Sequence, residues 1–251
     1  MTNENTKKLT FDLSSCALHI IAMLLMLCDH MWATVIPGND WLTCIGRAAF
    51  PIFAFMIVEG CFHTKSLKKY LLRMLIFAVV AEIPFNLMYI GAPFFPFHQN
   101  VMWTFLIGMG AIQLNELARK RKKLLLSMLT AAGTALAGYL LGTITFVDYG
   151  GAGVLTVLAF YFFRGRNWWC YIGQAAALIF INFGLLSGLQ YELSLFGSTL
   201  YFPQQGFAML SLLPIWLYSG RQGYHSKWFR YFCYAFYPAH MILLHIIRTF
   251  L

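Results

Sequence analysis

Several ionisable side chains fall inside long apolar runs of this sequence, and these are the residues whose types could do chemistry. An ionisable group within a membrane-spanning helix costs roughly 2.5–3.5 kcal/mol on insertion scales, so it usually faces the bundle interior and marks a function. A histidine near a carboxylate and an arginine can act as a general base, while the arginine holds a substrate or a developing oxyanion. The group consists of Asp29, His30, Arg47, Glu59, His63, Glu82, His240, His245 and Arg248.

The helical rise of about 1.5 Å per residue predicts the depth of these groups within their spans. The predicted order from the outer surface inward is Asp29, His30 and Arg47, then Glu82 and His240, then Glu59 and His63. Two alternatives stay open: Asp29 and Arg47 could form a structural ion pair, and His63 could be an interfacial histidine.

Known catalytic motifs are missing from the sequence, since it contains no HExxH, GxSxG, P-loop or GxGxxG pattern. The six cysteines are scattered without a CxxC pair, and the histidines fall on separate predicted spans. No disulfide and no metal site is therefore expected. The residues alone leave open a membrane enzyme and a transporter that uses the buried polar string as a proton or substrate relay.

The elements that must position these residues follow from composition, because the 251 residues are 60% hydrophobic and only 11% charged. A soluble domain is about a quarter charged, so the expected solvent is lipid. We predict an all-α fold: a single-domain (residues 1–251), polytopic transmembrane helix bundle of about nine spans. The predicted spans are 14–37, 41–62, 68–90, 100–118, 123–143, 149–163, 168–186, 204–219 and 231–251. The segment 187–203 is predicted to be re-entrant or interfacial.

The net charge of +9 is unevenly distributed along the chain. All 18 Lys and Arg residues except Arg47 and Arg248 lie on one side of the predicted spans. By the positive-inside rule this side is cytoplasmic, which predicts a cytoplasmic N-terminus, an outside C-terminus and a multi-pass protein of the plasma membrane. Because the charge is explained by topology, membrane lipid is expected as a partner and nucleic acid is not.

Four stretches of the sequence carry a resemblance to a known family. They are LHIIAMLLMLCDH at 18–30, the block 45–87 that begins IGRAAFPIFAF, QNVMWTFLIGMG at 99–110, and YAFYPAHMILLHIIR at 234–248. Together they resemble the TraX family, named for the F-pilin acetylation protein of conjugative plasmids. The middle of the chain, roughly 111–200, matches only in hydropathy.

The resemblance implies an integral membrane acetyltransferase, similar to the broader membrane acyltransferase superfamily. Such an enzyme moves an acetyl group from cytoplasmic acetyl-CoA, its co-substrate, to a hydroxyl or amine of an envelope glycan, lipid, cell-surface or peptide acceptor. The transfer could be direct or could pass through an acetyl-histidine.

The family's motif residues correspond here to Asp29, His30, Arg47, Glu59, His63 and Glu82, and the roles that follow are our mechanistic hypothesis. We expect His30 to be the general base, Asp29 to orient or charge-balance its imidazole, and Arg47 to bind the acceptor or the oxyanion. The expected catalytic residues are His30, Asp29, Arg47, Glu59 and Glu82. The expected cofactor-binding residues are His63, Lys69 and Arg73, and the expected substrate-binding residues are Asn100 and His240.

Overall fold

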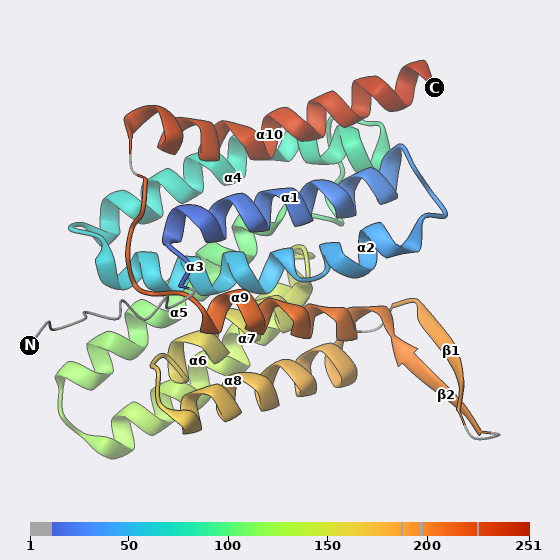
Figure 1. The fold of residues 1–251 in the computed structure, drawn as a ribbon. Coiled ribbons are helices and arrows are strands. Elements are labelled where there is room, and N and C mark those ends of the chain that lie inside the picture. The colour runs from blue at the N-terminus through green and yellow to red at the C-terminus, as the bar shows by residue number, and fades with distance from the viewer. Residues whose placement is uncertain (1–11, 187, 196–197, 225) are drawn as a thin grey trace, which may run out of the picture.

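A computed structural model describes residues 12–186, 188–195, 198–224 and 226–251, which form a bundle of roughly parallel and antiparallel helices (Figure 1). The first half contains α1 (Ser15–Thr34), α2 (Asp40–Gly46), α3 (Ala49–His63), α4 (Leu67–Ile90), α5 (Val101–Lys120) and α6 (Leu124–Ile144). The second half contains α7 (Gly150–Phe162), α8 (Trp168–Ile179), the π-helix η1 (Phe180–Leu185), β1 (Gln190–Leu195), β2 (Ser198–Pro203), the 3₁₀-helix η2 (Gln204–Ser211), α9 (Leu212–Trp216) and α10 (Lys227–Phe250).

Short polar side chains begin several of these helices. The hydroxyl oxygens of Ser14, Ser66 and Ser226 and the amide oxygen of Asn100 each accept a hydrogen bond from a backbone N–H in the first turn of α1, α4, α10 and α5. These caps satisfy donors that have no partner within the helix, so the boundaries are encoded locally.

Six helical segments of the described residues are long and apolar enough to cross a membrane. They are Ser15–Thr34, Asp40–His63, Leu67–Ile90, Val101–Lys120, Leu124–Ile144 and Trp168–Leu185. The predicted count of nine spans is therefore not confirmed. Helix α7 has 13 residues, the predicted span 204–219 is divided between η2 and α9, and α10 is long but more polar than the six.

The fold is helical as predicted, and the segment 187–203, predicted to be re-entrant or interfacial, contains two short strands that the prediction did not include. Strands β1 and β2 pair antiparallel from Gln190–Pro203 to Leu195–Ser198 and form a hairpin at one end of the bundle (Figure 1). The physical reason is composition: aromatic and β-branched residues such as Tyr191, Thr199 and Phe202 favour strands over helices.

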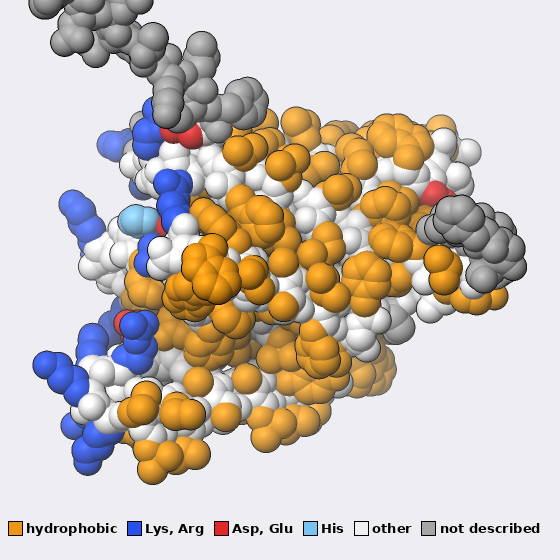
Figure 2. Space-filling view, turned by 60° about the horizontal axis from the view of Figure 1, so that its bottom comes forward, with side chains coloured by type: hydrophobic (Ala, Val, Ile, Leu, Met, Phe, Trp, Pro, Cys, Tyr) orange, Lys and Arg blue, Asp and Glu red, His pale blue; other side chains and the backbone are white. Residues whose placement is uncertain are grey.

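Charged side chains gather at one end of the bundle, which we call the basic end. Figure 2 shows Lys and Arg side chains concentrated there, while hydrophobic side chains cover the length of the face in view. Helices α1, α4, α6 and α10 all begin at this end, and the hairpin and the C-terminus lie at the other end (Figure 1). The Lys and Arg residues that fall on one side of the predicted spans in the sequence therefore gather at one end of the bundle in the structure.

Candidate functional site

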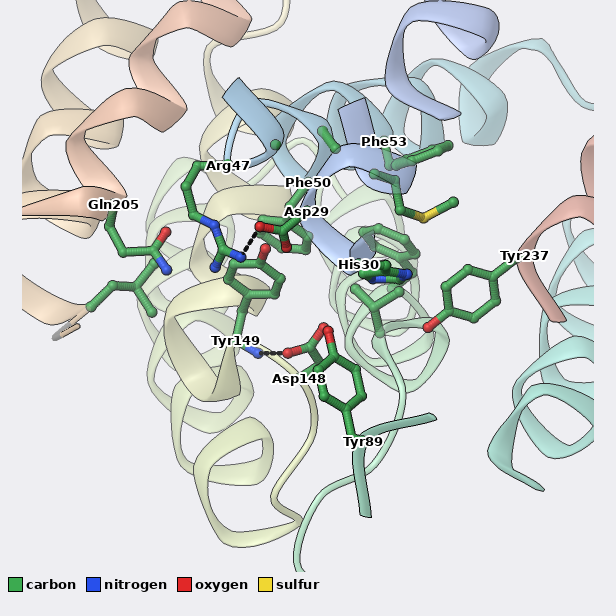
Figure 3. A pocket seen from close by; sticks show the side chains of 16 residues that line it. Asp29, His30, Arg47, Phe50, Phe53, Tyr89, Asp148, Tyr149, Gln205 and Tyr237 are labelled. Carbon is green, nitrogen blue, oxygen red and sulfur yellow. Dashed lines mark hydrogen bonds and ion pairs between the residues drawn. The ribbon is translucent and has the colours of Figure 1, made fainter. Parts of the chain in front are cut away.

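A cavity of about 200 Å³ lies in the half of the bundle away from the basic end, and we call it the histidine cavity (Figure 3). Its polar lining comes from α1, the α2–α3 junction, the end of α4, the turn before α7, η2 and α10. Its polar side chains include Asp29, His30, Arg47, Asp148, Tyr149 and Gln205. Segments from both halves of the sequence thus meet at one space.

A pair of histidines stands at one wall of this cavity. Nδ1 of His30 lies 2.7 Å from Nε2 of His240, and the two rings are nearly parallel at 12°. Nδ1 of His240 lies 2.7 Å from the carbonyl oxygen of Phe236. A carbonyl oxygen only accepts, so in the neutral pair His240 carries its proton on Nδ1 and offers a lone pair at Nε2.

This chain of bonds fixes the tautomer of His30 as well. Because Nε2 of His240 accepts, His30 must donate from Nδ1, which leaves Nε2 of His30 unprotonated. His30 lines the cavity, while His240 does not line it and is 5% exposed. The arrangement presents a basic nitrogen on a ring that His240 holds in one orientation.

Asp29 and Arg47 form an ion pair in the cavity wall. The guanidinium of Arg47 donates to Oδ1 of Asp29, and the hydroxyl of Thr43 donates to the same oxygen at 2.7 Å. The hydrogen-bond partner of His30 Nδ1 is therefore His240 and not Asp29, which neutralises Arg47 instead. The sequence had left this structural ion pair open as an alternative for the two residues.

Gly46 places this ion pair at the end of α2. A Cβ built on Gly46 would lie 2.5 Å from Cβ of Asp29, so only glycine allows α2 to approach α1 this closely. Helix α2 ends at Gly46 and α3 begins at Ala49. The break between them leaves Arg47 at the cavity.

Sequence reasoning missed the polar groups on the far side of the cavity. Asp148 accepts a hydrogen bond at Oδ1 from the backbone N–H of Tyr149 at 3.1 Å, and Tyr149 stacks on Phe50 with ring centroids 4.0 Å apart. Tyr149 has φ 61° and precedes Gly150 with φ 53°, so the chain turns sharply before α7. The motif Asp148-Tyr149-Gly150-Gly151 was a readable signal for this turn.

Glu82 and Asn100 lie outside the lining of the histidine cavity. The side-chain amide of Asn100 donates to Glu82 and, at 2.8 Å, to the carbonyl oxygen of Ala78, while the indole N–H of Trp103 donates to Glu82 at 3.0 Å. We call this cluster the α4–α5 anchor. A carboxylate at the N-terminus of α5 also interacts favourably with the helix dipole.

Glu59 and His63 lie near the basic end. Both carboxylate oxygens of Glu59 accept from Arg164, at 2.6 and 3.3 Å, and His63 lies 3.2 Å from the same carboxylate. Arg164 also stacks over the ring of Phe62 at 4.1 Å. Glu59 therefore joins α3 to the loop after α7 and does not line the histidine cavity.

A larger cavity of about 360 Å³ opens near the basic end, and we call it the basic-end cavity. His63 and Arg73 line it, together with His19 and Arg230, which the sequence did not single out. Lys69 is exposed on the first turn of α4 and is not among the lining residues.

The two cavities meet at shared aromatic side chains. Phe53 and Phe105 line both the histidine cavity and the basic-end cavity. Among the described residues, no group of three or more His, Cys, Asp or Glu side chains is placed to hold a metal ion. The protein therefore offers two adjoining spaces, one with a base and an arginine and one with cations.

The chain is similar to a known protein family. The family model described as TraX protein matches residues 14–248. A "Probable fimbrial assembly protein FimC, serogroup H1" from Dichelobacter nodosus is 28% identical over 262 residues, covering 96% of this chain and 98% of the relative. No solved structure matches.

Proposed function

The chain belongs to the TraX family, and we propose that it is a membrane acetyltransferase. It would move an acetyl group from cytoplasmic acetyl-CoA to a hydroxyl or amine of an acceptor in the cell envelope. Since its FimC relative is named as a probable fimbrial assembly protein, the proposal includes acceptors that take part in pilus or fimbrial assembly.

The proposed orientation places the basic end in the cytoplasm and the histidine cavity in the outer half of the plasma membrane. The concentration of Lys and Arg at one end of the bundle supports this orientation through the positive-inside rule (Figure 2). In this arrangement acetyl-CoA reaches the basic-end cavity directly from the cytoplasm.

The cations of the basic-end cavity would hold the phosphates of acetyl-CoA. His63, Arg73 and Arg230 line this cavity, and arginine is the residue best suited to bind phosphate. His19 and His30 are eleven residues apart on α1, which is about 17 Å at the helical rise. An extended pantetheine arm of about 15–20 Å spans that length, passing the shared side chains Phe53 and Phe105.

The His30–His240 pair carries the chemical part of the proposal. Nε2 of His30 would take a proton from the acceptor hydroxyl or amine as that group attacks the thioester carbonyl. The positive guanidinium of Arg47 would stabilise the tetrahedral oxyanion. Collapse of the intermediate breaks the carbon–sulfur bond, and His30 returns its proton to the departing CoA thiolate.

The test is transfer of radiolabelled acetyl from acetyl-CoA to envelope material by membranes that contain the protein. His30→Ala should lower the rate about 10²–10⁴-fold, the usual contribution of a general base. His245→Ala is the matched control, because His245 lies on α10 and does not line the histidine cavity. Full activity of His30→Ala would overturn the assignment, and substrate flux through liposomes without acetyl-CoA would favour a transporter.

A further inference from the structure

Two buried polar atoms that line the histidine cavity have no hydrogen-bond partner among the described residues. They are Nε of Arg47 and Oε1 of Gln205, and Gln205 as a whole is 8% exposed. Buried polar groups are almost always paired, because an unpaired one loses its bonds to water without replacement. Two such atoms in one cavity, one a donor and one an acceptor, point to a ligand that satisfies both.

The segments that carry the two atoms are joined by a single tyrosine of the hairpin. The hydroxyl of Tyr191 accepts a hydrogen bond from Sγ of Cys44 and another from Nε2 of Gln204, each at 3.4 Å. Cys44 stands three residues before Arg47, and Gln204 immediately precedes Gln205. Desolvation raises the pKa of Tyr191 to about 12, so its phenol stays neutral at physiological pH.

The pair requires a ligand that accepts one hydrogen bond and donates another. The N–H of an arginine Nε binds a carbonyl oxygen, and the carbonyl of a glutamine side chain binds an N–H. A secondary amide presents both on adjacent atoms. A carboxylate ligand would satisfy Arg47 but would oppose the oxygen of Gln205, and an ester or tertiary amide would leave Gln205 unpaired.

We propose that Arg47 and Gln205 form an acceptor subsite that recognises a secondary amide next to the group to be acetylated. The amide carbonyl binds Nε of Arg47 and the amide N–H binds Oε1 of Gln205. In Figure 3 both side chains lie on the side of the cavity away from Tyr237. The subsite rests on the proposed acetyl transfer, and it takes either a peptide bond or the acetamido group of an amino sugar.

The experiment uses the full chain purified in detergent and two pairs of small probes. Glycine N-methylamide and glycine N,N-dimethylamide differ in the amide N–H, and N-acetylglucosamine and glucose differ in the acetamido group. For each probe we would measure kcat/KM with acetyl-CoA and, without acetyl-CoA, protection against thermal unfolding. Wild type should prefer the secondary amide of at least one pair by at least about tenfold, since a buried polar site rejects an analogue that leaves it unpaired.

Gln205→Leu should abolish this preference, so that kcat/KM becomes equal for the two members of the pair. Gln113→Leu is the matched control, because it makes the same change in a different cavity, one that Cys61 and Lys120 line, and should keep the preference. Discrimination within the peptide pair identifies a peptide bond as the source, and discrimination within the sugar pair identifies an acetamido group.

The two hypotheses fail in different ways. Acetyl transfer with equal kcat/KM for both members of both pairs overturns the amide subsite and leaves the acetyltransferase intact. Amide-dependent thermal protection that Gln205→Leu removes, without any acetyl transfer, supports the subsite and counts against the proposed reaction. A Gln205→Leu variant that slows all probes equally also overturns the subsite, because that pattern is general damage.

Discussion

The histidine cavity and the α4–α5 anchor both gather buried polar side chains, but they differ in how those groups are satisfied. In the anchor, Asn100 donates to Glu82 and Ala78, and Trp103 donates to Glu82, so the chain pairs with itself. In the cavity, Arg47 and Gln205 each keep an unpaired atom beside open space. An ionised side chain is present in both regions, and the anchor also has one unpaired buried atom, Oδ1 of Asn86, whose amide donates to Glu82. Asn86 does not line the histidine cavity, whereas Arg47 and Gln205 do, so their unpaired atoms have room for a ligand.

Of the substitutions that distinguish the two regions, those at His240 should have the largest effect, because His240 acts on the reaction through His30. His240→Ala removes the acceptor for Nδ1–H of His30. Because His30 becomes positively charged as it takes the proton, this hydrogen bond is one from a charged group in the transition state and contributes about 1.5–3 kcal/mol, so its loss corresponds to a fall in kcat of roughly tenfold to a hundredfold. KM for acetyl-CoA and for the acceptor should change little, because His240 does not line the cavity.

The control for this prediction is His240→Gln. The side-chain carbonyl of glutamine can accept the same proton, so this variant should recover most of the lost kcat. Equal loss in both variants, or a change confined to KM, would contradict a role in orienting His30.

Substitutions in the α4–α5 anchor should lower the stability of the protein and leave kcat unchanged. Glu82→Ala leaves the amide of Asn100 and the indole of Trp103 without a shared acceptor, which should lower the free energy of unfolding by about 1–3 kcal/mol. Glu82→Gln keeps an acceptor oxygen and should lose less. Thermal unfolding in detergent measures the stability, and kcat per folded molecule measures the rate. A Glu82→Gln protein of normal stability but low kcat would return Glu82 to the catalytic role that the sequence predicts for it.

Gly46, where α2 packs against α1, can be compared with Gly133 in α6. Gly46→Ala places a methyl group 2.5 Å from Cβ of Asp29 and should destabilise the protein by about 1–3 kcal/mol while displacing Arg47. A Cβ on Gly133, in the interior of α6, meets no atom within 4 Å. Gly133→Ala should therefore raise stability by about 0.5–1 kcal/mol through helix propensity alone. If thermal unfolding showed that both substitutions change the stability in the same direction, the close approach of α2 to α1 would not require a glycine at position 46.

The sequence indicated which polar residues lie within the apolar helices better than it indicated which side chains pair with one another. The cost of placing an ionisable group in an apolar span was enough to single out His30, Arg47 and His240. Depth along each helix could be estimated from the rise per residue, but the rotation of one helix against another could not. His240 was therefore expected to bind substrate, whereas it lies behind His30.

The parts of the site that the sequence did not predict lie where the chain leaves regular helices. Gln205 follows a hairpin, and Asp148 precedes α7 in a turn with positive φ. Neutral amides and loop carboxylates cost little in a hydropathy profile, so hydropathy did not set them apart from interfacial residues. The Asp148-Tyr149-Gly150-Gly151 motif indicates a turn but not a site. Their places in the cavity lining depend on packing between elements that are distant in the sequence.

The smallest contrast concerns the hairpin, which we expect to tune the cavity without taking part in the reaction. Tyr191→Phe removes the oxygen that joins Cys44 to Gln204, and a neutral hydrogen bond contributes about 0.5–1.5 kcal/mol. The preference for the secondary-amide probe should therefore fall about two- to tenfold, measured as the ratio of kcat/KM within a probe pair.

Tyr201→Phe on β2 is the matched control, since Tyr201 is 60% exposed and should leave that ratio unchanged. A fall in the ratio for Tyr191→Phe alone would mean that the hairpin sets the separation of Arg47 and Gln205. Equal ratios in both variants and wild type would mean that the helical bundle fixes this separation without the hairpin, because the tether through Tyr191 would then carry no part of the amide preference.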